Sequence, residues 1–180
     1  FADLLTKPTL PEHYRPTLYD FIAHEALGFY TSGEFSAAKP EDAFEVRVSD
    51  PLLGPLDKFL AWVPETTDTE SPQFKAVRLY QDMLRFHLDD ADSSALNDTD
   101  ILRLLHGKRI AAGDGTNDRF IEAMQSLVER EPGPLSAWAR YHWAQTLHAD
   151  GDSVEARRVA IAGRDAFPES RGGNRCHNLV

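Results

Sequence analysis

Residues 142–170, HWAQTLHADGDSVEARRVAIAGRDAFPES, decide the fold class of this chain. Two runs of apolar residues at helical spacing are separated by Gly151, a residue type that can take positive φ where a helix ends. Either Asp152 or Ser153 can cap the second run. Pro168 ends it, because proline lacks an amide donor and pushes its predecessor towards extended geometry. The stretch therefore predicts a helical hairpin.

The apolar faces of these two predicted helices differ in side-chain size. One face of the first helix carries Trp138, Tyr141, Ala144 and Leu147. One face of the second carries Ala156, Val159, Ala160 and Gly163. Small side chains let two helix axes approach closely. The pattern thus predicts a tight contact between helices and not a catalytic surface.

Over residues 137–170 the sequence resembles the tetratricopeptide repeat family, whose helix-turn-helix units of about 34 residues stack into solenoids. The matching positions are Ala144, Leu147, Gly151, Ala156, Ala160 and Pro168. Two positions depart from the family pattern, because Arg140 stands where tryptophan is usual and Gly163 where alanine is usual. The resemblance implies a degenerate repeat. It also implies one possible function, the binding of an extended or helical peptide in a concave groove.

A single hairpin of this kind cannot bury its own apolar face, so the upstream chain is expected to supply packing partners. Helical spacing predicts further helices over residues 73–88, 97–111 and 119–131, the last of them closed by EPGP. The expected cap of the middle helix is Asn97 or Thr99.

The N-terminal third predicts one more helix, over residues 18–30. Thr17 and Asp20 have the spacing of a capping box at its start. The apolar stripe expected to face the core consists of Leu18, Phe21, Ile22, Ala26 and Phe29.

These patterns predict an all-α fold, an irregular stack of antiparallel helix pairs with at most one short strand or hairpin. The strongest alternation, Phe44, Val46 and Val48 against polar neighbours, fits either one short strand or an extended surface segment. Residues 1–180 are expected to form a single helical domain. Within it we expect an irregular part over 1–62, a repeat-like part over 63–170 and a tail over 171–180.

Composition excludes several classes of function. Of the 180 residues 42% are hydrophobic, and no apolar run approaches the roughly 20 residues of a membrane-spanning helix. The formal net charge of −10 would repel a phosphate backbone over most of the surface. We therefore expect neither a membrane span nor nucleic-acid binding. The arginines of residues 156–158 and 170–175 are interpreted as solvated residues.

The residues that could carry catalysis or hold a metal form no recognised constellation. None of the seven histidines repeats at i and i+4 beside a carboxylate as in a zinc helix; they are His13, His24, His87, His106, His142, His148 and His177. No nucleophile elbow or phosphate-binding loop is present either. The sequence therefore predicts a protein that is not an enzyme, with no catalytic, cofactor-binding or metal-binding residues and no cofactor.

Several of these polar residues are expected to have structural or solvated positions. The acidic runs that begin at Asp90 and Asp114 lack glycine at the required position of a calcium loop and are interpreted as solvated loops between helices. His87 and His142 are expected at helix margins. His106, at an expected helix end, can carry charge near the C-terminal dipole.

A wider resemblance covers nearly the whole chain. The stretches that carry it are residues 15–30, 42–46 and 50–87, the tetratricopeptide-like hairpin, and residues 167–180. Together they resemble the helical N-terminal region of large bacterial alpha-2-macroglobulin-like proteins. In that family a segment like the one here with Gly172, Gly173, Cys176, Asn178 and Leu179 leads into the first macroglobulin β-sandwich.

This second resemblance implies protease inhibition by bait cleavage and entrapment, in many members with an internal Cys-Gln thioester. The chain has no Cys-Gly-Glu-Gln stretch, so Cys176, its one cysteine, is not that thioester. The chain itself would be a non-catalytic helical scaffold or interaction module of a periplasmic or cell-surface protein. Its implied partners are proteins: downstream domains of the same chain, proteases or a peptide ligand. The alternative is an independent tetratricopeptide-type adaptor.

The two ends of the sequence also support expectations. Phe1 in place of methionine predicts a processed or shortened start, and the final Leu-Val pair predicts that a further segment follows. We expect the tail from Arg171 onward to be mobile without that segment, with Cys176 packing against it.

Overall fold

The structure, a computed structural model, describes residues 11–33 and 41–180, and over these ranges the chain is helical without β-strands. Its α-helices are α1 (Leu18–Thr31), α2 (Leu56–Ala61), α3 (Pro72–Phe86), α4 (Ser94–Ile110), α5 (Thr116–Arg130), α6 (Leu135–Ala149), α7 (Ser153–Ala166) and α8 (Arg171–His177). Two short 3₁₀ helices, η2 (Glu12–Tyr14) and η3 (Pro51–Leu53), precede α1 and α2. The predicted all-α fold is confirmed.

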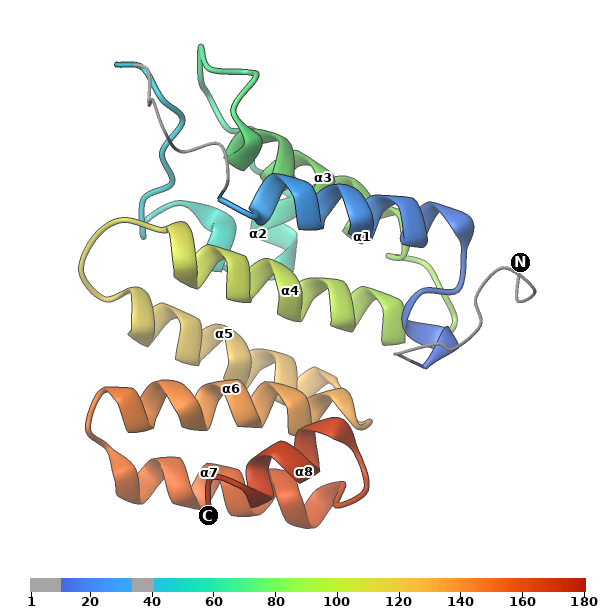
Figure 1. The fold of residues 1–180 in the computed structure, drawn as a ribbon, viewed down its shortest axis with the longest axis vertical. Helices are drawn as coiled ribbons and strands as arrows, with labels where there is room; N and C mark the ends of the chain where they lie inside the picture. Colours follow the sequence, from blue (N-terminus) through green and yellow to red (C-terminus); the bar gives the residue numbers. More distant parts are fainter. Residues whose placement is uncertain (1–10, 34–40) are drawn as a thin grey trace.

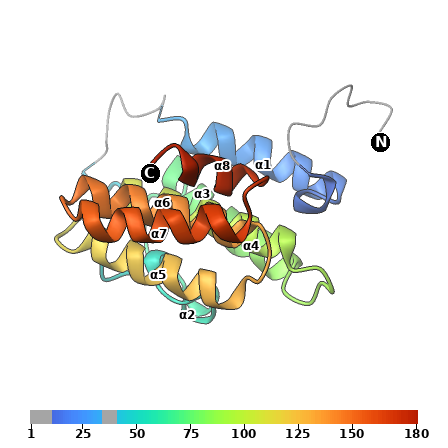
Figure 2. The same ribbon diagram turned by 90° about the horizontal axis from the view of Figure 1, so that it is seen from below.

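The helices stack in the order of the chain (Figure 1). Starting from one end, α1 packs on α3, α3 on α4, α4 on α5, α5 on α6, and α6 on α7. The last helix, α8, packs on both α6 and α7. α1 and α8 lie on one side of the stack and α2 on the other (Figure 2). None of the described helices is both long and apolar enough to cross a membrane.

The hairpin of α6 and α7 is confirmed, together with its turn. Gly151 has φ of +91°, and Asp152 rather than Ser153 caps α7 by accepting a hydrogen bond from the amide of Glu155 at 3.1 Å. The buried residues of α7 are the four of the predicted small-residue stripe. α7 ends at Ala166, two residues before Pro168.

Ala160, in that stripe, is fully buried against Ala144, Val159 and Cys176. We expect Ala160→Leu to overpack this contact and lower the free energy of unfolding by about 1–3 kcal/mol. Ala162→Leu is the matched control, because the same substitution there falls on an exposed position of the same helix. Urea denaturation followed by circular dichroism measures both. Equal stability of the two variants would mean that the stripe does not face α6.

The N-terminal helix begins as predicted but faces the opposite way. Its capping box is present, with the Thr17 hydroxyl accepting from the amide of Asp20 and the Asp20 carboxylate accepting from the amide of Thr17. However, the buried positions of α1 are Asp20, Ala23, His24 and Leu27. Leu18 and Ile22, from the expected core stripe, are 53% and 58% exposed. The prediction of the buried face was therefore wrong.

Two other elements also differ from expectation. α4 begins at Ser94, so Asn97 and Thr99 lie inside the helix and cap nothing, and the acidic run from Asp90 is mostly helical and not a solvated loop. The alternating segment forms no strand: Phe44 and Val46 are buried, and one parallel bridge joins Arg47 to Ala112.

The C-terminal residues were expected to form a tail, and here the sequence expectation was also wrong. Arg171–His177 is the helix α8, capped by the Ser170 hydroxyl, which accepts from the amide of Gly173 at 2.9 Å. Cys176 is buried within this chain, with Sγ 3.6 Å from the carbonyl oxygen of Ala137. Two glycines let α8 lie directly on neighbouring backbone, since a Cβ on Gly172 would meet the backbone of Trp138.

Candidate functional site

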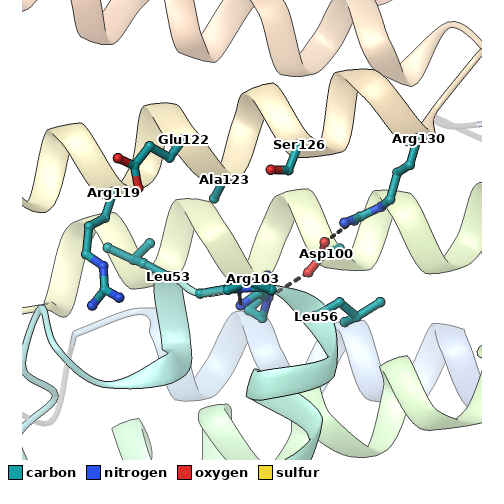
Figure 3. Close-up of a pocket in the computed structure, with 11 residues that line it drawn as sticks. Leu53, Leu56, Asp100, Arg103, Arg119, Glu122, Ala123, Ser126 and Arg130 are labelled. Atoms are coloured by element: carbon teal, nitrogen blue, oxygen red, sulfur yellow. Dashed lines mark hydrogen bonds and ion pairs between the residues drawn. The ribbon is translucent and has the colours of Figure 1, made fainter.

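A small pocket lies where the turn from η3 into α2 faces α5 (Figure 3). Its volume is about 140 Å³. One row of α5 lines it, formed by Arg119, Glu122, Ala123, Ser126 and Arg130. Asp100 and Arg103 of α4 approach it from the base. The pocket thus combines three arginines and two carboxylates from elements that are distant in the sequence.

The charged groups at the base of the pocket are bonded to one another. Arg103 donates from Nε to Asp100 Oδ1 at 2.6 Å, and Arg130 bonds the second oxygen of the same carboxylate. Burial would raise the pKa of Asp100, but the two guanidinium groups outweigh it and lower the pKa. Asp100 is therefore a carboxylate with both oxygens occupied, which is an arrangement for anchoring helices and not for taking up a proton.

Arg103 is 1% exposed, and the rest of its guanidinium is also occupied. Nη1 donates to the carbonyl of Leu52 at 2.6 Å, and both terminal nitrogens donate to the carbonyl of Gly54 at 3.2 Å. The guanidinium carbon lies 4.7 Å from the centre of the Phe59 ring. One side chain of α4 thus holds the η3–α2 turn in place through its backbone.

The polar network continues from Asp100 to the end of α5. Asn97 donates to Glu131 at 2.5 Å and accepts from Arg130 Nε at 3.3 Å. The other carboxylate oxygen of Glu131 accepts from the amide of Gly133 at 2.7 Å. These bonds explain why Asn97 and Asp100 are buried in a helix although their stretch of sequence resembles a loop.

A second buried polar cluster joins α1 to the end of α3. His87 Nε2 lies 2.6 Å from Asp20 Oδ1, and its Nδ1 lies 2.7 Å from Asp90 Oδ2. Burial would lower the pKa of His87, but the hydrogen bonds to Asp90 and Asp20 outweigh it and raise the pKa. For Asp20, burial would raise the pKa, but hydrogen bonds from His87 and Thr17 lower it.

An Asp–His contact is also part of catalytic triads, where the second ring nitrogen faces a nucleophile. In this cluster the second nitrogen of His87 faces the carboxylate of Asp90. The protonated ring can donate to both carboxylates, which favours an ion pair that holds α1 against α3. His87 does lie at a helix margin, as predicted.

Other ionisable groups are held in their neutral forms. Burial lowers the pKa of His24 and of His106 to about 4, and a nearby arginine adds a smaller effect in the same direction. His106 is thus uncharged, contrary to the expectation of a charged helix end. Burial raises the pKa of the Cys176 thiol to about 11. Within residues 11–33 and 41–180, no group of three histidine, cysteine or acidic residues is arranged to hold a metal ion.

Asp98, on α4, is a buried carboxylate with one oxygen that has no hydrogen-bond partner among the described residues. Its side chain is 7% exposed, and Oδ2 accepts no hydrogen bond within the described part of the chain. Burial raises its pKa to about 6, although Arg15 and Arg171 act in the opposite direction. The ionised form of Asp98 is therefore a cost to the folded state near neutral pH.

We expect Asp98→Asn to stabilise the protein by about 1–2 kcal/mol at pH 7.5. A raised acid pKa means that the destabilising effect of ionisation is absent below pH 3.8 and complete above about pH 6. The gain should therefore disappear as the pH falls through this window. Urea denaturation at several pH values measures it, with Asp114→Asn in an exposed loop as the control. A gain that does not change with pH would contradict the assignment.

Comparison with protein-family models, with curated proteins and with solved structures finds no match for this chain.

The two polar clusters were not predicted from the sequence. The i, i+3 spacing of Asp100 and Arg103 is visible in the sequence. The partners of Arg103 around η3, and the partner of His87 on α1, are many residues away.

Proposed function

We propose that this chain is a non-catalytic helical scaffold or interaction module of a larger macroglobulin-like, protease-inhibitor-type protein of the periplasm or cell surface. The observation that carries the proposal is that three side chains able to do chemistry are committed to internal contacts. His87 is bracketed by two carboxylates, Asp100 by two arginines, and Cys176 is buried. Removing one partner of such a buried pair is strongly destabilising, so these charged groups have a structural role in helix packing.

The reading frame that encodes the chain tests the macroglobulin-like part of the proposal. A signal peptide upstream and a long β-rich extension downstream are expected. The encoded parent protein is then expected to inhibit proteases, whereas the present chain alone leaves them active. A reading frame without a β-rich extension would contradict this part.

The non-catalytic part has a separate test. The purified chain is assayed against ester, peptide and phosphate-ester substrates, and no turnover is expected. Turnover that is abolished by His87→Gln, in a variant whose circular dichroism is unchanged, would overturn it.

A tetratricopeptide-type adaptor is the second candidate, and one feature favours it. α8 packs on both α6 and α7, as the first helix of a further repeat would. At this junction the Arg171 guanidinium lies 4.1 Å from the centre of the Trp138 ring. An adaptor would bind a peptide as an isolated chain, and Arg171→Ala would weaken that binding.

A further inference from the structure

The outward face of α1 carries an apolar patch that continues onto α3. We define the α1–α3 patch as Leu18, Tyr19 and Ile22 of α1 with Phe86 of α3. These side chains are 53%, 37%, 58% and 51% exposed, respectively. The rings of Tyr19 and Phe86 lie 4.7 Å apart, so the two helices form one surface. α1 lies at the outside of the stack (Figures 1 and 2).

This arrangement reverses the usual rule for a surface helix, whose apolar stripe faces the core. α1 instead turns Asp20 and His24 inward and leaves Leu18 and Ile22 outward. Clustered exposed apolar residues mark interaction sites when they have polar surroundings. The orientation of α1 is therefore informative about what the helix contacts.

The orientation of α1 is fixed by polar contacts. The Asp20–His87 pair is 2.6 Å long and both side chains are 1% exposed. Rotating α1 to bury Ile22 would expose or break this pair, and a buried ion pair is costly to separate. The patch therefore remains outward in the folded chain and is available to another molecule.

The charges around the patch are mostly acidic. α1 contains Glu25 but no lysine or arginine. Burial raises the pKa of the Tyr19 hydroxyl, and Asp82 of α3 lies close enough to raise it further. Arg85 is bonded to Asp82 at 3.3 Å and to the carbonyl of Leu60, and exposed Asp89 follows on the chain. The rim thus favours a cationic partner.

We infer that the α1–α3 patch docks an amphipathic helix of a partner protein whose apolar stripe is flanked by lysines or arginines. Leu18 and Ile22 are one helical turn apart and Tyr19 lies beside them, which suits the i, i+3, i+4 anchors of a docked helix. A second copy of this chain would bring acidic rims together, and an anionic membrane would be repelled in the same way. The inference deepens the proposed interaction role by giving the chemistry of the partner.

The test uses a labelled synthetic peptide of leucine and lysine, about four helical turns long, with all leucines on one face. Fluorescence anisotropy with the full chain is expected to show saturable binding that weakens when salt is raised to about 0.3 M. The double variant Leu18→Asn, Ile22→Asn is expected to bind about tenfold more weakly. Because both residues are exposed, its circular dichroism and thermal melt should match the unchanged chain.

Controls separate docking at the patch from attraction between opposite charges. Val154→Asn removes an aliphatic side chain that is 85% exposed on α7, far along the chain, and should leave binding unchanged. Two control peptides, a scrambled leucine–lysine peptide and a leucine–glutamate peptide with the same apolar face, should bind at least about tenfold more weakly. Equal binding of any control peptide, or an unchanged affinity of the double variant, would overturn the inference.

Two further measurements distinguish the other occupants. A dimer in sedimentation velocity that is lost in Ile22→Lys would assign the patch to a second copy and overturn the inference. Cosedimentation with anionic phosphatidylserine vesicles that is lost in the same variant would assign it to a membrane and also overturn it. If the peptide does not bind, the proposed scaffold role is unaffected, because that role has separate tests. These are the assay of the chain for substrate turnover and the assay of the parent protein for protease inhibition.

Discussion

Replacing Arg103 by methionine is expected to lower the free energy of unfolding by about 3–5 kcal/mol. Methionine keeps much of the side-chain length but removes the cation that Asp100 contacts at 2.6 Å. It also leaves the carbonyls of Leu52 and Gly54 without their buried donor. Urea denaturation followed by circular dichroism measures the loss.

The matched control for this variant is Arg158→Met. Arg158 also bonds a carboxylate three residues earlier, Glu155, but its side chain is 66% exposed. Exposed pairs of this kind contribute about 0–1 kcal/mol. If Arg103→Met were no more destabilising than Arg158→Met, the network at the base of the pocket would not hold α4 to the η3–α2 turn.

Gly172→Ala is expected to cost about 3 kcal/mol, in the upper part of the range for overpacking. A Cβ at this position would lie less than 3.0 Å from the backbone nitrogen and Cα of Trp138, and a helix backbone cannot move aside as a flexible side chain can. α8 must therefore shift away from α6. The thiol of Cys176, on the buried side of α8, should then react faster with a disulfide reagent such as dithionitrobenzoate.

The same substitution at Gly28 is a control with the opposite sign. Gly28 is exposed in α1, and a Cβ there would meet nothing within 4 Å. Alanine has the better helix propensity, so Gly28→Ala should stabilise by about 0.5–1 kcal/mol. Thiol reactivity should not change in this variant. A Gly172→Ala variant with full stability and an unreactive thiol would show that α8 is not in backbone contact with α6.

The parts of the fold that could be predicted are those with local signals. The turn at Gly151 and the capping box at Thr17 each need only a few adjacent residues. The small-residue stripe of α7 was also readable, because one face of that helix is buried and the other is exposed. Gly163 stands where the tetratricopeptide pattern usually has alanine, and the structure explains why a glycine is needed there. A Cβ there would lie 2.7 Å from the sulfur of Cys176.

The parts that could not be predicted depend on distant partners. α4 contacts α3, α5, η2 and η3, so its buried residues surround the helix and show no apolar period. The buried face of α1 is selected by His87, 67 residues away, so Asp20 faces the core together with Ala23 and Leu27 and the predicted apolar stripe faces outward. α8 has two glycines, which disfavour a helix in isolation. Gly172 fits against the backbone of α6, and Gly173 fits against the backbone of Phe167 and Pro168.

The contact between Asp20 and His87 also has a consequence for biosynthesis. Asp20 leaves the ribosome 67 residues before His87, a delay of about 3–13 seconds at usual elongation rates. During this interval α1 has neither its ion pair nor α3, and both its apolar stripe and its polar face are exposed. We expect chaperone contacts with the nascent chain to concentrate on this segment and to end once α3 has emerged.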